Sequence, residues 1–153
     1  MRARLGFLFA AASLAIASPL AAAPADDFRQ VLAEHYQWLL RNKPTYATAL
    51  GVGDYDDRIQ DLSPAAREAR VRQAQAFLTR LDAIPADQLS PADRVNHAIL
   101  RRMLAEAVEE WRHGQRDMLF TTYYGWHQGF AGLADDVPLR NRADFHSYLA
   151  RLA

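Results

Sequence analysis

The sequence contains no cysteine among its 153 residues. Disulfide bonds are therefore excluded, and so is the lipidated cysteine that anchors bacterial lipoproteins. Basic and acidic residues are equal in number, 18 of each, so the chain has no excess of positive charge that would favour nucleic acid or an anionic membrane. Half of the residues are hydrophobic, which is too many for a disordered chain. Core packing must therefore supply the stability of the fold.

The sequence also lacks an apolar run long enough to span a bilayer comfortably, which takes about 20 residues. The most apolar stretch, Leu5 to Leu20, is shorter, and it follows the basic residues Arg2 and Arg4. Small residues come directly after it, in the sequence "AAAPADD". A positive start, a short apolar run and small residues together predict a secretory signal peptide. An uncleaved membrane anchor is the alternative.

We expect the signal peptide to occupy residues 1–25. Cleavage after Ala23 would leave Pro24 at the first mature position, where its ring should hinder the peptidase, so cleavage after Ala25 is preferred. The mature chain, residues 26–153, would then carry a formal net charge of about −2. It would be periplasmic or secreted, with no membrane contact beyond the signal peptide.

Apolar residues at three- and four-residue steps predict amphipathic helices along the mature chain. The first should be capped by Asp26 or Asp27 and stop near Arg41 to Lys43, with His35 partly buried in its apolar stripe. A short helix from Pro44 to Leu50 should follow. Gly51 lies just past its end, where glycine commonly terminates a helix.

Two longer helices should begin at Ser63 and Ser90, because each serine can cap a helix and is followed by a proline suited to the first turn. Asn141 should cap a last helix, which has no glycine or proline after it. The predicted apolar sides of these three helices are, in order, Val71, Ala74, Phe77, Leu78, Leu81 and Ile84; Val95, Ile99, Met103, Leu104, Ala107, Val108 and Trp111; and Phe145, Tyr148, Leu149 and Leu152.

These patterns predict an all-α fold, an antiparallel helical array with about five helices after the signal peptide. Residues 26–153 would form one helical domain that is incomplete at its carboxyl end, the amino-terminal portion of a larger, mostly helical domain. Between the longer helices lies an aromatic and glycine-rich segment, residues 118–133. We expect it to be an irregular connection whose rings pack in the core, with a ligand-contacting or interface surface formed by Tyr123, Tyr124 and Trp126 as the alternative.

No complete catalytic or metal-binding constellation is present. The turn from Tyr46 to Arg58 contains closely spaced aspartates but lacks the oxygen ligands and glutamate of a calcium loop. Glu110 and His113 share a helical face, yet a di-iron bundle needs a second such pair and further glutamates. Asp93 and His97 are predicted to be an exposed pair. We therefore predict no catalytic, cofactor-binding or metal-binding residue in this chain.

Three stretches resemble one family. They are "KPTYATALGVGDYDDRIQDLSP", "LSPADRVNHAILRRML" and "ADFHSYLARL", and together they are similar to the amino-terminal part of the bacterial domain of unknown function 885 family. The similarity runs from about Phe28 to the end of the chain. The resemblance implies an exported, largely helical protein of several hundred residues, and many members resemble zinc metallopeptidases that carry His-Glu-x-x-His well downstream. No such motif occurs in these 153 residues.

The resemblance therefore implies the amino-terminal helical segment of an exported, zinc-dependent, peptidase-like hydrolase, with the catalytic motif and the zinc expected beyond residue 153. Its substrate would be a peptide or another small molecule, and its exposed apolar helix faces could mediate self-association. The alternative is a complete small periplasmic helical protein that binds or interacts through segment 118–133. A helical bundle without a ligand is a third possibility.

Overall fold

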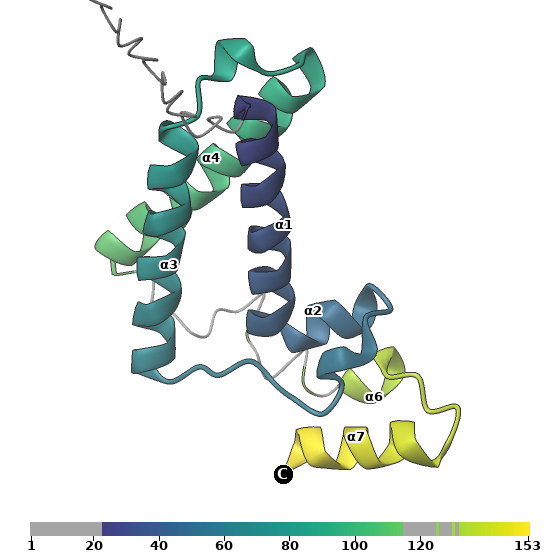
Figure 1. Cartoon of the computed structure of the whole chain (residues 1–153). Coiled ribbons are helices and arrows are strands. Elements are labelled where there is room, and N and C mark those ends of the chain that lie inside the picture. Colours follow the sequence, from purple (N-terminus) through teal and green to yellow (C-terminus); the bar gives the residue numbers. More distant parts are fainter. Residues whose placement is uncertain (1–22, 115–124, 126–129, 131) are drawn as a thin grey trace, which may run out of the picture.

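The structure is a computed structural model that describes residues 23–114, 125, 130 and 132–153. The described part is helical and contains no β-strand, which confirms the prediction of an all-α fold (Figure 1). None of its helices is both long and apolar enough to cross a membrane. The helices are α1 (Pro24–Asn42), α2 (Pro44–Ala49), α3 (Pro64–Asp82), α4 (Pro91–Arg112), α6 (Leu133–Asp136) and α7 (Arg142–Leu152), with short 3₁₀ turns at Gly53–Tyr55 and Ala86–Gln88.

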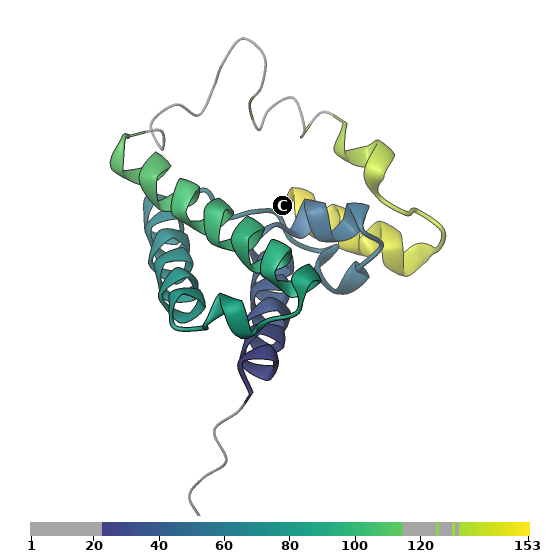
Figure 2. The same ribbon diagram turned by 90° about the horizontal axis from the view of Figure 1, so that it is seen from above.

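Helices α1, α3 and α4 form the main body. Helix α3 runs antiparallel to α1, and a short link that contains the second 3₁₀ turn returns the chain into α4 (Figure 1). Helix α4 crosses the other two, while α2, α6 and α7 group together at one side (Figure 2). The core is formed by buried residues of α1, α3, α4 and the link between the last two, namely Phe28, Val31, Ala74, Phe77, Leu81, Ile84, Leu89, Leu100, Leu104 and Val108.

Most predicted helix boundaries are confirmed because local side chains determine them. The hydroxyl oxygens of Ser63 and Ser90 accept hydrogen bonds from backbone amides three residues further along, at 3.3 and 3.1 Å. Gly51 adopts a φ of +79° directly after α2, a conformation that residues with a Cβ atom rarely adopt. The predicted cap of α1 is wrong, because α1 begins at Pro24 and both Asp26 and Asp27 lie within its first turn.

Helix α4 buries only part of its predicted apolar side, because Leu104 and Val108 are buried as predicted and other members of that side are exposed. The buried residues are His97, Leu100, Leu104 and Val108, whereas Val95, Ile99 and Met103 are exposed. Apolar residues occur on two faces of α4, so periodicity alone could not choose between them. The contacts with α1 and α3 decide which face is buried.

His97 is therefore not the exposed partner of Asp93 that the sequence suggested. Its side chain is 7% exposed, and its Nε2 atom lies 2.9 Å from the carbonyl oxygen of Leu81 in α3. Its ring centroid is 5.7 Å from that of Phe28 in α1. This histidine links all three helices of the main body, because its ring packs against Phe28 of α1 and its Nε2 atom lies within hydrogen-bond distance of Leu81 in α3.

The last helix has the predicted cap, and its predicted apolar stripe is largely exposed. The side-chain oxygen of Asn141 accepts hydrogen bonds from the amides of Ala143 and Asp144, at 2.8 and 3.0 Å. Three of the four residues in its predicted apolar stripe are 42 to 48% exposed. These residues are Phe145, Leu149 and Leu152. The one buried side chain reported for α7 is that of Arg151.

Candidate functional site: a groove among three helices

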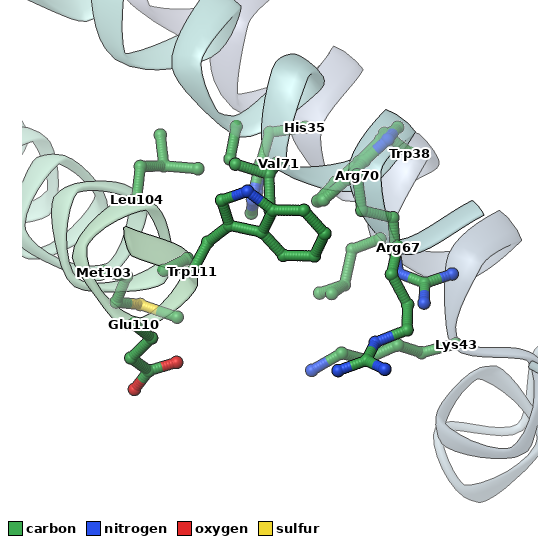
Figure 3. Close-up of a pocket in the computed structure, with 13 residues that line it drawn as sticks. His35, Trp38, Lys43, Arg67, Arg70, Val71, Met103, Leu104, Glu110 and Trp111 are labelled. Carbon is green, nitrogen blue, oxygen red and sulfur yellow. The ribbon is translucent and has the colours of Figure 1, made fainter. Parts of the chain in front are cut away.

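A groove lies among α1, α3 and α4, with a volume of about 410 Å³ (Figure 3). Its lining is mainly apolar and aromatic, with charged groups at the edges. Ligand sites in proteins commonly have this composition, at volumes of about 300–1,000 Å³. The lining residues are His35, Trp38, Leu39, Lys43, Arg67, Arg70, Val71, Ala74, Met103, Leu104, Ala107, Glu110 and Trp111.

An aromatic cluster forms the base of the groove on the α1 side. The ring of His35 lies 5.6 Å from that of Trp38 and 5.4 Å from that of Phe77, and the last two rings are 5.8 Å apart. The contacts with Phe77 are edge-to-face, an arrangement that the charge distribution of aromatic rings favours. His35 is thus half-buried, as predicted.

The pKa of His35 is lowered from its ordinary value. Burial is the main cause because it disfavours the charged imidazolium, and the positive charge of Lys43 adds to the effect. His35 is therefore held neutral to lower pH than an exposed histidine. At neutral pH the His35 ring is therefore uncharged, and the base of the groove is an aromatic surface without a positive charge.

Charges of opposite sign stand on opposite edges. Lys43, Arg67 and Arg70 lie on one side of the groove and Glu110 on the other, with the indole of Trp111 between them (Figure 3). The cationic edge comes from the end of α1 and the first turns of α3, and the acidic edge from the last turns of α4.

Arg70 holds its place through a hydrogen bond from Nη1 to the carbonyl oxygen of Asp61, at 2.7 Å. The pKa of the Arg70 guanidinium is lowered by burial, the largest effect, and by the charge of Arg67, while Asp61 opposes both. The two arginines are thus close enough to repel each other in a partly desolvated position. An anion placed between them would reduce that repulsion.

The groove has the composition of a ligand site but brings together no cluster of candidate metal ligands among the described residues. No group of three or more histidine, aspartate or glutamate side chains in the described part could hold a metal ion. Of the predicted Glu-x-x-His pair, Glu110 lines the groove, while His113 is exposed and lies 3.7 Å from Glu109. The interpretation of that pair as ordinary surface charges therefore agrees with where His113 lies.

The aromatic alternative cannot be compared with this groove. Tyr123, Tyr124 and Trp126, the predicted contact residues of segment 118–133, lie outside the described residues. Two positions of the segment that are described differ in environment, since Phe130 is 40% exposed and Leu133 is 3% exposed.

The aspartate-rich turn has a structural role that the sequence did not reveal. Nη2 of Arg151 donates to Thr48 Oγ1 at 2.7 Å and to the carbonyl oxygen of Tyr55 at 2.9 Å. It also lies 3.4 Å from a carboxylate oxygen of Asp56. The turn thereby receives a buried arginine from α7. No local pattern predicts this contact, because Arg151 and Thr48 are 103 positions apart.

Comparison with known proteins gives one result. Residues 44–153 match the family described as "Bacterial protein of unknown function (DUF885)". No curated protein and no solved structure matches the chain. The match includes the turn that receives Arg151, two residues of the groove's cationic edge and all of α4. Since it covers well over half of the sequence, the chain belongs to the DUF885 family.

Proposed function

We propose that this chain is the amino-terminal helical segment of an exported, zinc-dependent, peptidase-like hydrolase. The family match supports one part of this proposal, namely that the chain is related to DUF885 proteins. The hydrolase class follows from the resemblance of many such proteins to zinc metallopeptidases with a downstream His-Glu-x-x-His motif. The groove supports it further, since it could hold part of a small ligand beside a catalytic centre formed elsewhere.

The observation that carries the proposal is the apolar surface of α4 and α7. Six large side chains, three on each helix, remain 42 to 58% exposed. Contiguous apolar surface on a folded protein marks a contact with another element or molecule. Further helices of a larger domain would cover such faces, except at Met103, which also lines the groove. The six residues are Val95, Ile99, Met103, Phe145, Leu149 and Leu152.

Zinc does not fit the described residues, among which no suitable cluster of metal ligands exists. We therefore assign no residue of this chain to the metal and derive no reaction step through it. The chain's contribution would be to support the larger helical domain and to bind substrate. The metal ligands would be supplied by residues that follow position 153.

The coding sequence after codon 153 tests the proposal. We expect an in-frame continuation that encodes His-Glu-x-x-His. The longer product should contain about one zinc per chain by elemental analysis, hydrolyse peptides, and lose activity with EDTA. Replacing the glutamate of that motif with glutamine should abolish hydrolysis and leave the zinc content unchanged. A stop codon followed by unrelated sequence, or a longer product without zinc or hydrolysis, would refute the proposal.

Export is tested separately by fractionating bacteria that express the full coding sequence. The mature protein should appear in the periplasm or medium and begin at Asp26 by amino-terminal sequencing. A product that begins at Pro24 would move the cleavage site. A product that retains residues 1–25 in the membrane would replace the signal peptide with an anchor.

The exposed faces also support self-association of this chain when it is isolated. Light scattering during size-exclusion chromatography should show concentration-dependent dimers or larger species. Ile99→Lys should shift them toward monomer, while Ala98→Lys, a neighbouring exposed position, should not. A stable monomer that binds a ligand through segment 118–133 would instead favour the alternative, a complete small binding protein.

A further inference from the structure

We propose that the groove among α1, α3 and α4 binds a short apolar peptide with free ends, its carboxylate beside Lys43, Arg67 and Arg70 and its ammonium beside Glu110. The inference deepens the proposed function and rests on it for the choice of a peptide as the ligand. The groove's shape and charges specify the rest: a ligand with an apolar body and opposite charges at its two ends (Figure 3).

The apolar body follows from the surface between the charged edges. Trp38 and Trp111, from different helices, both line the groove together with Leu104 and Met103. Met103 is 57% exposed although its side chain is apolar, so a ligand here would cover surface that water now contacts. Burying apolar surface contributes about 25 cal/mol per Å². A peptide with leucine-like side chains gains this contribution, and a strongly polar one does not.

The carboxylate follows from the crowding of cations at one edge. Arg67 and Arg70 are one helical turn apart at the start of α3, and the charge of Arg67 acts to lower the pKa of Arg70. Lys43 enters the same edge from the end of α1 and influences His35 electrostatically. A carboxylate beside these cations, of which Arg67 and Arg70 are partly buried, forms charge-assisted hydrogen bonds, which are stronger than neutral ones.

Glu110 distinguishes a peptide from a simple apolar acid. It lies on the edge opposite the three cations, where a ligand's second end would reach (Figure 3). A fatty acid would place only methylene groups there and would offer the glutamate no charged partner. A peptide's terminal ammonium can pair with it. Charge complementarity at both ends therefore favours the zwitterion.

Binding can be measured on the protein purified from the periplasm after expression of the full coding sequence. Trileucine with free ends is the probe, titrated by calorimetry and by the fluorescence of the groove's tryptophans. Three further probes separate the interactions: trileucine amide lacks the carboxylate, N-acetyl-trileucine lacks the ammonium, and laurate lacks the peptide. We expect trileucine to bind about tenfold more tightly than either blocked peptide.

Variants assign each end to its edge. Lys43→Met and Arg67→Gln should each weaken trileucine about tenfold and have little effect on the already weak binding of trileucine amide. Glu110→Gln should weaken trileucine and leave N-acetyl-trileucine unchanged. Arg72→Gln and Glu109→Gln make the same changes of charge on α3 and α4 outside the groove and should leave every affinity unchanged. Circular dichroism spectra that match the unaltered protein verify that each variant is folded.

Absence of trileucine binding, tighter binding of laurate than of trileucine, or binding that none of the groove variants alters would each overturn the inference. These results are distinguishable from a failure of the proposed function. Peptide binding to the groove without zinc or hydrolysis in the longer product would retain the binding site and reject the hydrolase. Zinc-dependent hydrolysis without binding at this groove would do the reverse.

Discussion

Replacing Asp56 should destabilise the protein more than replacing Arg151, although the two form one ion pair. The Arg151 side chain is fully buried and that of Asp56 is 16% exposed. Thr48 joins them, since its hydroxyl donates to Asp56 at 2.5 Å and accepts from Arg151 at 2.7 Å. Because Arg151 is the more deeply buried of the two, its charge depends more on nearby counter-charges and hydrogen-bond acceptors.

Arg151 is only partly satisfied by these contacts. Its Nη2 atom makes all of the hydrogen bonds described above, while Nε and Nη1 are buried without a partner in the described part of the chain. Burial lowers the pKa of the guanidinium, and the charges of Asp56 and Asp57 oppose that effect. The nearest carboxylate oxygen of Asp56 is 3.4 Å away, which is long for a charge-assisted hydrogen bond.

The expected free energies follow from this asymmetry. Asp56→Asn keeps the shape but leaves a buried cation without its nearest counter-charge, a change that costs about 3–5 kcal/mol. Asp57 still contributes some attraction, so we expect about 3 kcal/mol. Arg151→Met removes hydrogen bonds worth about 1 kcal/mol each, but it also removes a desolvated charge and two unpaired donors that cost about 1–3 kcal/mol each. The net loss should be about 1 kcal/mol or less.

Urea unfolding followed by circular dichroism measures these differences in the unfolding free energy. Asp54→Asn is the matched control, because this aspartate lies in the same turn and is exposed, and it should change stability by less than about 0.5 kcal/mol. In the Arg151→Met background, Asp56→Asn should cost little, since the buried cation is gone. If Arg151→Met alone costs more than Asp56→Asn, the guanidinium is well satisfied and the reasoning is wrong.

Three other predictions concern single side chains. His97→Ala should cost about 2–4 kcal/mol, because it leaves a cavity and removes the contact with the α3 carbonyl, whereas Val95→Ala, at a side chain 58% exposed, should cost less than about 0.5 kcal/mol in the same urea assay. Ser90→Ala should lower stability by about 1 kcal/mol through loss of the α4 cap, and Ser90→Thr, which keeps the hydroxyl, should restore most of it. The pKa of His35 is lower in the folded protein than in the unfolded chain, so the unfolded chain binds a proton first as the pH falls. The stability that this residue contributes above about pH 6.5 is therefore lost as the pH falls through the folded pKa. Unfolding at pH 7.5 and 5.5 should therefore show a smaller loss for His35→Gln than for the unaltered protein, and an equal loss would reject the effect.

Local chemistry explains which features of the fold were predictable. The capped starts of α3, α4 and α7 were predicted from Ser63, Ser90 and Asn141, because a cap bonds to amides two or three residues away. The end of α2 was predicted for a similar reason, since glycine adopts the positive φ found at Gly51 without the strain that a Cβ atom would cause. The cap of α1 was the exception, because the helix begins at Pro24, ahead of both predicted capping residues.

The groove could be predicted from the sequence only in part. Most of the apolar residues that line it, Trp38 excepted, were recognised as helix stripes, but nothing in their spacing shows that three helices leave a space between them. Lys43, Arg67 and Arg70 gave no signal, because basic residues near helix ends are common on any surface. Glu110 was singled out for a metal pair and lies instead on the groove's acidic edge.

The sequence by itself determined the all-α class, the helix limits and the absence of a metal-binding motif, because these depend on neighbours a few residues apart. Only the tertiary structure decided which face of α4 is buried, where His97 lies and why Arg151 enters the aspartate-rich turn. Arg151 meets its partners across 95 to 103 positions of the chain. The physical reason is that burial is settled by how helices pack against one another, and a helix with apolar residues on two faces satisfies its own local preferences with either face inward.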